Sequence, residues 1–239
     1  MRNLKCSGGY LKNQTRKNLA KALLCIVLFG LIFFLLCLRV LFTLSLGIFE
    51  EAGLLFSLVP LAAFYFYLRK YRIYNGGWQG EKSVAKLLSK TLSDDYYLIN
   101  DVYLHDGGGD IDHIVLAPNG VFVLETKNWS GKITCNGDEW QRPSKHNMGS
   151  PSRQAKRNAA KIKHIIDSSP TLRSLSIWVE GLVVFTNNHA SLNINNPTIP
   201  ILKIQQLPNT ITTHKTNNHY TQQQLEQMGK EILKQANTK

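Results

Sequence analysis

Residues 111–132 read IDHIVLAPNGVFVLETKNWSGK and contain two apolar runs joined by a Pro-Asn-Gly turn. Asn-Gly is the preferred pair for a two-residue type I′ hairpin, because both residues tolerate a positive φ. We therefore expect Asn119 and Gly120 to form the loop of an antiparallel hairpin. In that register Pro118 lies opposite Val121.

Counting back from this turn places Asp112 opposite Lys127 and Ile114 opposite Glu125. Residues directly opposite each other share a face of the sheet, and Glu125 and Lys127 share one because they are two apart. Asp112, Glu125 and Lys127 should therefore converge at the open end of the hairpin. A slip of one residue would scatter them, so the expectation depends on this turn, or on a bulge that restores its register.

Two carboxylates and a lysine on one face of a sheet edge can form a magnesium-dependent phosphodiester-cleaving site. Mg²⁺ prefers oxygen ligands, keeps several waters and takes only one or two carboxylates from a protein. We expect Asp112 and Glu125 to hold Mg²⁺ or Mn²⁺, and Lys127 to orient the attacking water or stabilise the developing charge. A cross-strand salt bridge between Lys127 and Asp112 is the alternative, and the spacing alone does not choose between them.

Two long apolar runs near the start of the chain, residues 22–38 and 52–68, contain no charged residue and reach the lower end of membrane-spanning length. Arg39 follows the first run, so the end of that span is left open. A cleaved signal peptide is the alternative for the first run. No small-residue cleavage pattern follows it, however, and a second run is present. We therefore expect a hairpin of two retained transmembrane helices.

Basic residues flank this hairpin on its outer ends, and acidic residues lie between the two runs. The flanking basic residues are Arg2, Lys5, Lys12, Arg16, Lys17, Lys21, Arg69, Lys70 and Arg72, and the acidic ones are Glu50 and Glu51. The positive-inside rule then predicts a two-span membrane protein with both termini in the cytoplasm and the lipid bilayer as a partner.

The whole chain is basic, with 28 Lys and Arg against 16 Asp and Glu in 239 residues. Setting aside the seven basic residues before and just after the first run, and the two glutamates between the runs, leaves 21 basic and 14 acidic residues. An excess of this sign suits a polyanion or an anionic membrane surface, and charge alone does not separate the two. The four cysteines are too scattered to indicate a disulfide framework or a zinc site.

Apolar periodicity and turn residues predict a mixed sheet with helices packed on it, an α/β fold. We expect helices over residues 78–92, 152–167 and 220–234, and strands over 96–104, 181–186 and 199–204 beside the hairpin. A turn at 106–110 precedes the hairpin, and a short edge strand over 132–135 follows it. After that edge strand we expect a polar loop that includes Trp140 and runs to Pro151, and further along the chain surface loops over 187–198 and 209–218. The corresponding organisation is a basic N-terminus (1–21), two transmembrane helices (22–68), a linker (69–77), the α/β domain (78–205) and a C-terminal loop and helix (206–239).

Several short motifs in this order resemble the nuclease-related domain, NERD, of the PD-(D/E)xK restriction-endonuclease-like superfamily. They are GE at Gly80 and Glu81, NDVYL at 100–104, the stretch 111–131 quoted above, and the later Trp140. The resemblance covers roughly residues 77–185. It implies a restriction-endonuclease-like fold and metal-dependent hydrolysis of nucleic acid, with DNA favoured over RNA.

The resemblance also implies a set of site residues, which are Glu81, Asp112, Glu125, Lys127 and Gln154. By position alone, Glu81 near a helix N-terminus would interact favourably with the helix dipole or serve solubility. The resemblance instead makes it a third metal ligand beside Asp112 and Glu125, or a group that orients water. Gln154, early in the following helix, remains open between a functional role and a solvated or capping one.

Other polar and aromatic residues of this region favour structural roles. His113 lies on the opposite strand face from Asp112, which favours a hydrogen-bonded interior histidine over a base. Trp129 and Trp140 favour packing over base stacking.

The function expected from these features is that of a membrane-anchored, metal-dependent nuclease on the cytoplasmic side. Two alternatives stay open: a nucleic-acid-binding module that keeps the fold without turnover, and a membrane scaffold in which the basic helix over 152–167 binds anionic lipid.

Overall fold

The computed structural model describes residues 1–5, 9–43, 48–104, 110–143 and 149–237, and its chain divides into two compact units. The first comprises residues 1–9 and 79–239, and the second comprises residues 10–78. One long helix, α2 (Ile48–Thr91), contributes to both units.

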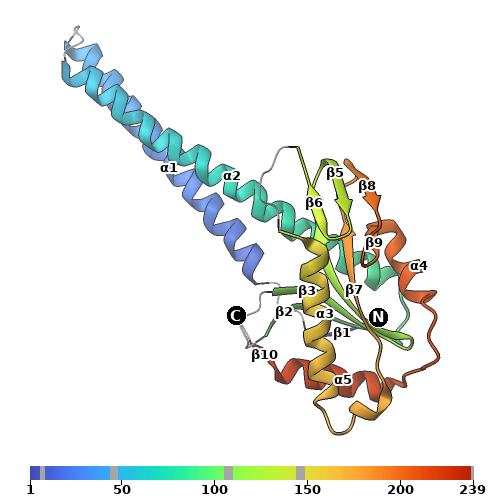
Figure 1. Cartoon of the computed structure of the whole chain (residues 1–239). Helices are drawn as coiled ribbons and strands as arrows, with labels where there is room; N and C mark the ends of the chain where they lie inside the picture. The colour runs from blue at the N-terminus through green and yellow to red at the C-terminus, as the bar shows by residue number, and fades with distance from the viewer. Residues whose placement is uncertain (6–8, 44–47, 105–109, 144–148, 238–239) are drawn as a thin grey trace. The chain divides into compact units, whose positions relative to one another are not determined.

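The first unit is built on a large mixed sheet with the strand order β1-β2-β3-β4-β7-β9 (Figure 1). The strand pairs β2–β3 and β3–β4 are antiparallel, whereas β1–β2, β4–β7 and β7–β9 are parallel. A short seventh strand, β10, also pairs with β2. The strands are β1 (Arg2–Lys5), β2 (Tyr97–Leu104), β3 (Asp110–Ala117), β4 (Gly120–Lys127), β7 (Val179–Phe185), β9 (Ile201–Lys203) and β10 (Ala236–Asn237).

Helices cover both faces of this sheet. On one face, α3 (Pro151–Asp167) and α5 (Gln222–Lys234) bury apolar side chains such as Ile162 and Met228 against β2, β3 and β4. On the other face, the C-terminal part of α2 and the short α4 (Leu207–Thr212) do the same with Leu88 and Ile211. The predicted α/β class, a mixed sheet flanked by helices, is therefore confirmed.

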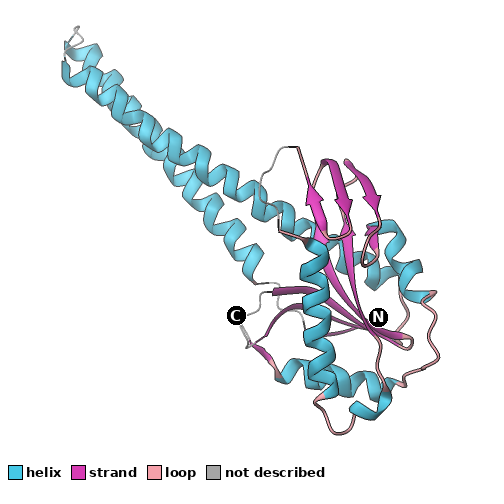
Figure 2. Ribbon diagram, in the orientation of Figure 1, coloured by secondary structure: helices cyan, strands magenta, loops and turns pink. Residues whose placement is uncertain are grey.

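A second, three-stranded sheet has the order β6-β5-β8, drawn in magenta in Figure 2. Its strands are β5 (Gly131–Asn136), β6 (Glu139–Gln141) and β8 (Ala190–Asn195). Three expectations fail here. Residues 132–135 belong to the central strand rather than an edge strand, Trp140 lies in β6 rather than a loop, and residues 190–195 of the predicted surface loop 187–198 form β8. The predicted loop 209–218 is also wrong at its start, where α4 extends to Thr212. Part of the predicted polar loop, residues 144–148, lies outside the described residues, as do residues 106–109 of the predicted turn.

The hairpin between β3 and β4 forms, but its turn is shifted by one position. Ala117 pairs with Gly120, so the two loop residues are Pro118 and Asn119. Among the described residues, positive φ outside glycine occurs only at Asp101, Ser176 and Asn196, so Asn119 does not adopt the predicted type I′ conformation. Proline at the first loop position presets a negative φ, which favours an ordinary turn there.

The shift changes the register by two residues. Ile114 pairs with Val123 rather than Glu125, and the predicted register is wrong. Because side chains alternate with a period of two, however, a two-residue shift leaves each side chain on its predicted face. We expected Asp112, Glu125 and Lys127 to share a face only with the Asn119–Gly120 turn, or with a bulge that restores its register. This expectation is wrong for the same reason.

The predicted helix start at Trp78 is also wrong, because α2 runs without a break through residues 69–77. A Cβ on Gly77 would lie 3.2 Å from the Leu11 Cδ1 atom of α1. The glycine therefore leaves room for a neighbouring helix instead of ending its own.

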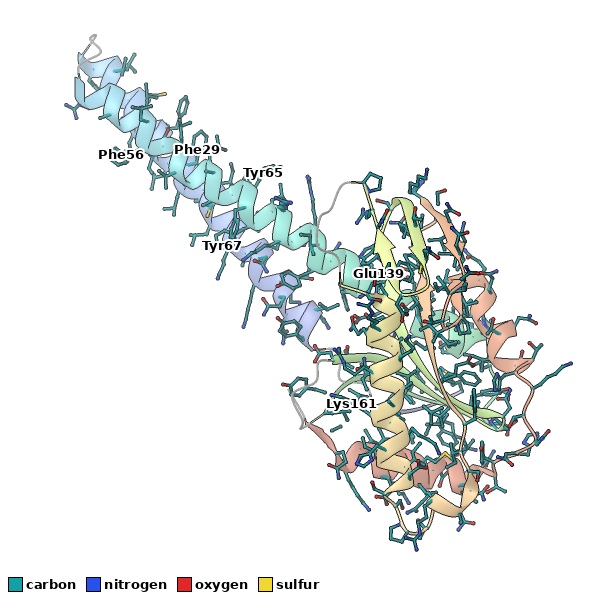
Figure 3. All side chains as sticks on the ribbon, in the orientation of Figure 1. Phe29, Phe56, Tyr65, Tyr67, Glu139 and Lys161 are labelled. Carbon is teal, nitrogen blue, oxygen red and sulfur yellow. The ribbon has the colours of Figure 1, made fainter. Side chains whose placement is uncertain are left out.

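In the second unit, α1 (Tyr10–Thr43) and α2 lie antiparallel. Leu11 contacts the position of Gly77, Lys21 lies 5.3 Å from the Tyr67 ring centroid, and Leu36 lies against Gly53. Both helices are long and apolar enough to cross a membrane, with mean hydropathies of 2.9 and 1.5 in their most apolar windows, of which 0% and 6% is buried. Figure 3 shows Phe29, Phe56, Tyr65 and Tyr67 on these two helices.

Residues 2–5 form a strand that the sequence did not predict. β1 pairs in parallel with the start of β2, and the Arg2 guanidinium donates to the Tyr97 hydroxyl at 3.1 Å. The large sheet thus includes strands from before and after the helical hairpin, which is inserted between them along the chain.

Gly181 of β7 tests the packing of α3 on the sheet. A Cβ at this position would lie 2.8 Å from the backbone carbonyl of Ala155, an atom that cannot move aside. Gly181→Ala should lower the free energy of unfolding by about 1–3 kcal/mol, measured by thermal unfolding of the detergent-purified chain. Gly149→Ala is the control, since nothing lies within 4 Å of its added Cβ. Equal melting temperatures for both variants would contradict this packing.

Candidate active site

The site is centred on the point where β3 and β4 stop pairing. Their last recorded pair is His113 with Leu124. Beyond it, the Asp112 carboxylate accepts a hydrogen bond from the Thr126 backbone N–H at 2.6 Å. The side chain thus replaces a ladder hydrogen bond where the two strands separate, and the carboxylate is held at the C-terminal end of β4.

Glu125 and Lys127 extend from this end of β4. The Lys127 Nζ atom donates to Glu125 Oε1 at 2.5 Å, whereas Glu125 Oε2 is buried and has no hydrogen-bond partner. The Glu125 side chain is only 2% exposed. The salt bridge between Lys127 and Asp112, left open as the alternative, is replaced by an ion pair with Glu125, although Asp112 still acts on the lysine electrostatically.

Glu81 reaches the same region from α2. A Cβ on the preceding Gly80 would lie 2.9 Å from Thr186 Oγ1 and 3.2 Å from Asn128 Cβ. Because Gly80 has no side chain, α2 approaches the residues that follow β4 and β7. Glu81 lies in the interior of α2 and not in a first turn, so a role with the helix dipole is excluded.

Burial and neighbouring acidic residues raise the pKa values of these carboxyl groups. Burial, and then the charges of Asp112 and Asp101, raise the pKa of Glu81 to about 9. Burial and Asp112 raise that of Glu125 to about 8, against the opposing charge of Lys127. Burial raises the pKa of Asp112 to about 6, again against Lys127. The site therefore crowds more carboxyl groups together than its single lysine can neutralise, and the pKa values of Glu81 and Glu125 rise above neutral pH.

The Lys127 ammonium is stabilised in return. Burial lowers the pKa of this amine, but Glu125, Asp112 and Glu81 together raise it above its ordinary value. The amine also lies 5.7 Å from the Trp129 ring centroid. A permanent positive charge is thus kept beside the carboxylates.

Gln154 is separate from this group in the described contacts. It lies half-buried in the first turn of α3, where its backbone N–H donates to the Ser150 carbonyl at 3.0 Å. Its side chain makes no recorded hydrogen bond with the four predicted partners. Arg157, one turn further along α3, does act on the site, since its charge lowers the pKa of Glu125.

Sequence reasoning missed Asp101, Asp110 and Arg157. Asp101 has a φ of 50°, lies in β2 and raises the pKa of Glu81, as does Asp110 at the start of β3. Asp101 belongs to the NDVYL motif and Arg157 to the basic helix, but the sequence assigned neither residue to the active site. Their placement depends on strand alignment that no local pattern shows.

The structural roles predicted for His113 and the two tryptophans are confirmed. His113 is buried, its Nδ1 lies 2.7 Å from Asn100 Oδ1, and burial lowers its pKa to about 3. Trp140 stacks on Phe185 with ring centroids 5.8 Å apart, and Trp129 packs edge-on against both rings.

Residues 76–186 match the family model described as the nuclease-related domain, NERD. The chain carries a NERD domain. Its matched segment includes Glu81, Asp112, Glu125, Lys127 and Gln154. An uncharacterized protein of Bacillus anthracis is 48% identical over 60 residues, which span 24% of this chain and 28% of that relative. No solved structure matches the chain.

The donor groups of the NERD site fit a divalent cation bound through few protein ligands. Within the described parts of the chain, no three His, Cys, Asp or Glu side chains form a ready metal cage. Two carboxylates with several waters are nevertheless sufficient for Mg²⁺. The unpartnered Glu125 Oε2 and the crowding of carboxyl groups both favour a cation at this point, because a bound cation stabilises their ionised forms.

The burial of Glu81 in the NERD site predicts a measurable pH dependence of stability. Its pKa rises from 4.5 to about 9 on folding, so the folded protein retains a proton that the unfolded chain releases. The associated stability is present below about pH 4.5 and is lost as the pH rises toward about 9. Glu81→Gln should raise the melting temperature near pH 9, by the equivalent of about 1 kcal/mol or more, and change it little near pH 4.

This measurement is made by thermal unfolding in EDTA, with Glu139→Gln as the control. Glu139 is exposed and pairs with Arg153 away from the carboxylates. Parallel pH–stability curves for the wild type and Glu81→Gln would show that Glu81 is not buried among these charges.

Proposed function

We propose that the chain is a membrane-anchored, metal-dependent nuclease whose NERD domain hydrolyses phosphodiester bonds of nucleic acid on the cytoplasmic side of the membrane. The observation that carries the proposal is the convergence of Glu81, Asp112, Glu125 and Lys127 at the C-terminal end of β4. Such a concentration of buried charge is costly to fold, and groups with strongly shifted pKa values gather at functional sites.

In this proposal, Asp112 and Glu125 hold Mg²⁺ or Mn²⁺, and Glu81 is the third carboxylate near it. When bound, the ion lowers the pKa of a coordinated water and polarises a phosphate oxygen. The Thr126 N–H fixes the orientation of the Asp112 carboxylate. Glu125 Oε2 is the free acceptor that faces the ion, because Oε1 is occupied by the lysine.

Lys127 supplies a positive charge next to the scissile phosphate. The neighbouring carboxylates keep its amine protonated, so it stabilises the charge that develops on the phosphorus oxygens and orients the attacking water. Gln154 and Arg157 are on one side of α3, three residues apart, and extend the polar surface from the site. We assign Gln154 a positioning role toward water or phosphate.

DNA is the preferred substrate in this proposal, and RNA is the second candidate. The basic composition of the chain and the charge of α3 favour a polyanion.

The membrane anchor is the hairpin of α1 and α2, with residues 22–38 and 52–68 as the two spans. The exposed apolar side chains of these helices require a nonaqueous environment or a partner. β1 precedes the hairpin and β2 follows it in the same sheet, which requires both ends of the hairpin to lie on one side of the bilayer. The flanking basic residues make that side the cytoplasm.

Cleavage by the detergent-purified full chain tests the proposed chemistry. With Mg²⁺ or Mn²⁺, the wild type should cleave labelled DNA, and Asp112→Asn, Glu125→Gln and Lys127→Met should each reduce the rate by at least about 10²-fold. Lys132→Met is the matched control, since this lysine is exposed on the neighbouring β5. Cleavage that needs no metal or survives Asp112→Asn would contradict the proposal. Salt-dependent binding without turnover would identify a binding module instead.

The topology is tested by labelling single cysteines in intact cells. A cysteine at Asp94, an exposed residue of the NERD domain, should react with a membrane-impermeant maleimide only after permeabilisation. A cysteine at position 46, between the two helices, should react before it. Extraction of the chain from membranes by alkaline carbonate would refute the anchor.

A further inference from the structure

A cavity of about 640 Å³ lies beside α3, and its walls come from α3, the segment after it, the end of β2, and α5 with its C-cap, all in the first unit. Arg157, Lys161 and His164 line it from α3, Leu104 from the end of β2, and Glu231 and Gln235 from α5 and its C-cap. Its volume lies in the range of roughly 300–1,000 Å³ that is usual for small-molecule sites.

The basic wall follows from the spacing of its residues. Positions 157, 161 and 164 recur every three or four residues, so they form one stripe along the helix. Arg153, Lys156 and Lys163 of α3 lie outside the lining of the cavity, and each forms an ion pair. Lys163 pairs with Asp167, for example, and Lys156 with Asp138. Figure 3 labels Lys161 on this helix.

The lining of the cavity is linked to the candidate active site directly through Arg157 and less directly through Leu104. Arg157 lines the cavity and also acts electrostatically on Glu125. Leu104 follows Tyr103, and Tyr103 pairs with Asp110 at the start of β3. The charge of Asp110 raises the pKa values of Glu81 and Asp112. A strand whose scissile phosphate lies at Lys127 would therefore pass the mouth of this cavity.

The lining suits a nucleotide better than a bare anion. Ala160, Ile165 and Pro170 add apolar surface to that of Leu104, and this surface can receive the faces of a base. Arg157 and Lys161 can bind a phosphate. Glu231, whose Oε1 already accepts from Lys234 at 2.8 Å, places a carboxylate on the opposite wall where a base amino group could donate.

We propose that this cavity receives one unpaired nucleotide of the substrate strand, next to the scissile phosphate, with its phosphate against Arg157 and Lys161. A base stacked within a duplex cannot enter a cavity without being extruded, so the substrate is single-stranded nucleic acid or a duplex with an unpaired or extruded nucleotide. This inference rests on the proposed function, because the substrate is taken to be nucleic acid.

The test measures binding of a fluorescent single strand of about 12 nucleotides to the full chain in detergent, with EDTA to prevent cleavage. Ala160→Trp fills the cavity from an exposed wall position, and Lys161→Met removes a charge. Each should weaken single-strand binding by at least about tenfold. Lys163→Met, on the same helix but outside the cavity, should change it by less than about twofold.

Competition and strandedness identify the occupant. A nucleoside 5′-monophosphate should displace the strand at concentrations where inorganic phosphate does not, and fully paired duplex should bind more weakly than the single strand. If inorganic phosphate competes as well as the nucleoside 5′-monophosphate, the cavity binds an anion but no base, and the inference is overturned. Unchanged binding in both cavity variants would also overturn it.

A parallel cleavage assay with the same proteins separates this inference from the proposed function. If the wild type does not cleave, but Ala160→Trp and Lys161→Met weaken binding, the hydrolysis fails and the nucleotide cavity stands. If the wild type cleaves single strands and both variants cleave them equally well, the cavity inference fails and the nuclease stands.

Discussion

The hydrogen bond from the Thr126 N–H to the Asp112 carboxylate is the contact on which the site depends. It spans the place where β3 and β4 separate, and so it fixes one acidic side chain against the backbone between Glu125 and Lys127. Without that contact, the end of β4 would have an unpaired backbone donor on one side, and Asp112 would be free to turn toward water. The separation of the strands also creates the space in which Glu81 approaches from α2.

The close approach of α2 has a simple steric basis in Gly80, as the packing of α3 on β7 has in Gly181. Two helices thereby bring charged side chains to one end of the sheet from opposite faces: Glu81 from one and Arg157 from the other. Glu81 comes from the α2 side, and the basic stripe begins on the α3 side. In the proposed function, a phosphate chain between them meets the proposed cation site and then the basic stripe.

Much of this site could be predicted from sequence, because the sheet face on which a strand residue lies depends only on whether its position along the strand is odd or even. The expected turn was misplaced by one position, since Pro118 presets a negative φ that a type I′ turn excludes, yet the acids still meet. Other features depend on distant partners. β1 has only four residues, and its partner lies beyond two helices. β8 carries Ala190, Leu192 and Ile194 in alternation, a strand pattern that its asparagines obscured.

The glycine pair before Trp78 shows a different limit. Glycine indicates a break when only the local chain is considered, but here Gly77 gives space to Leu11, and the helix continues. The low helix propensity of glycine does not end a helix where a neighbouring helix fills the space that the missing side chain leaves.

The insertion of the hairpin between β1 and β2 has a consequence for biosynthesis. β1 leaves the ribosome first, but its partner on the sheet follows only after both helices have been made. The edge of the sheet therefore stays open throughout translation of the hairpin and closes after the helices have emerged. In the proposed membrane-anchored protein, delivery of the helices to the bilayer therefore comes before completion of the domain, and the finished sheet forms on a chain that is already tethered.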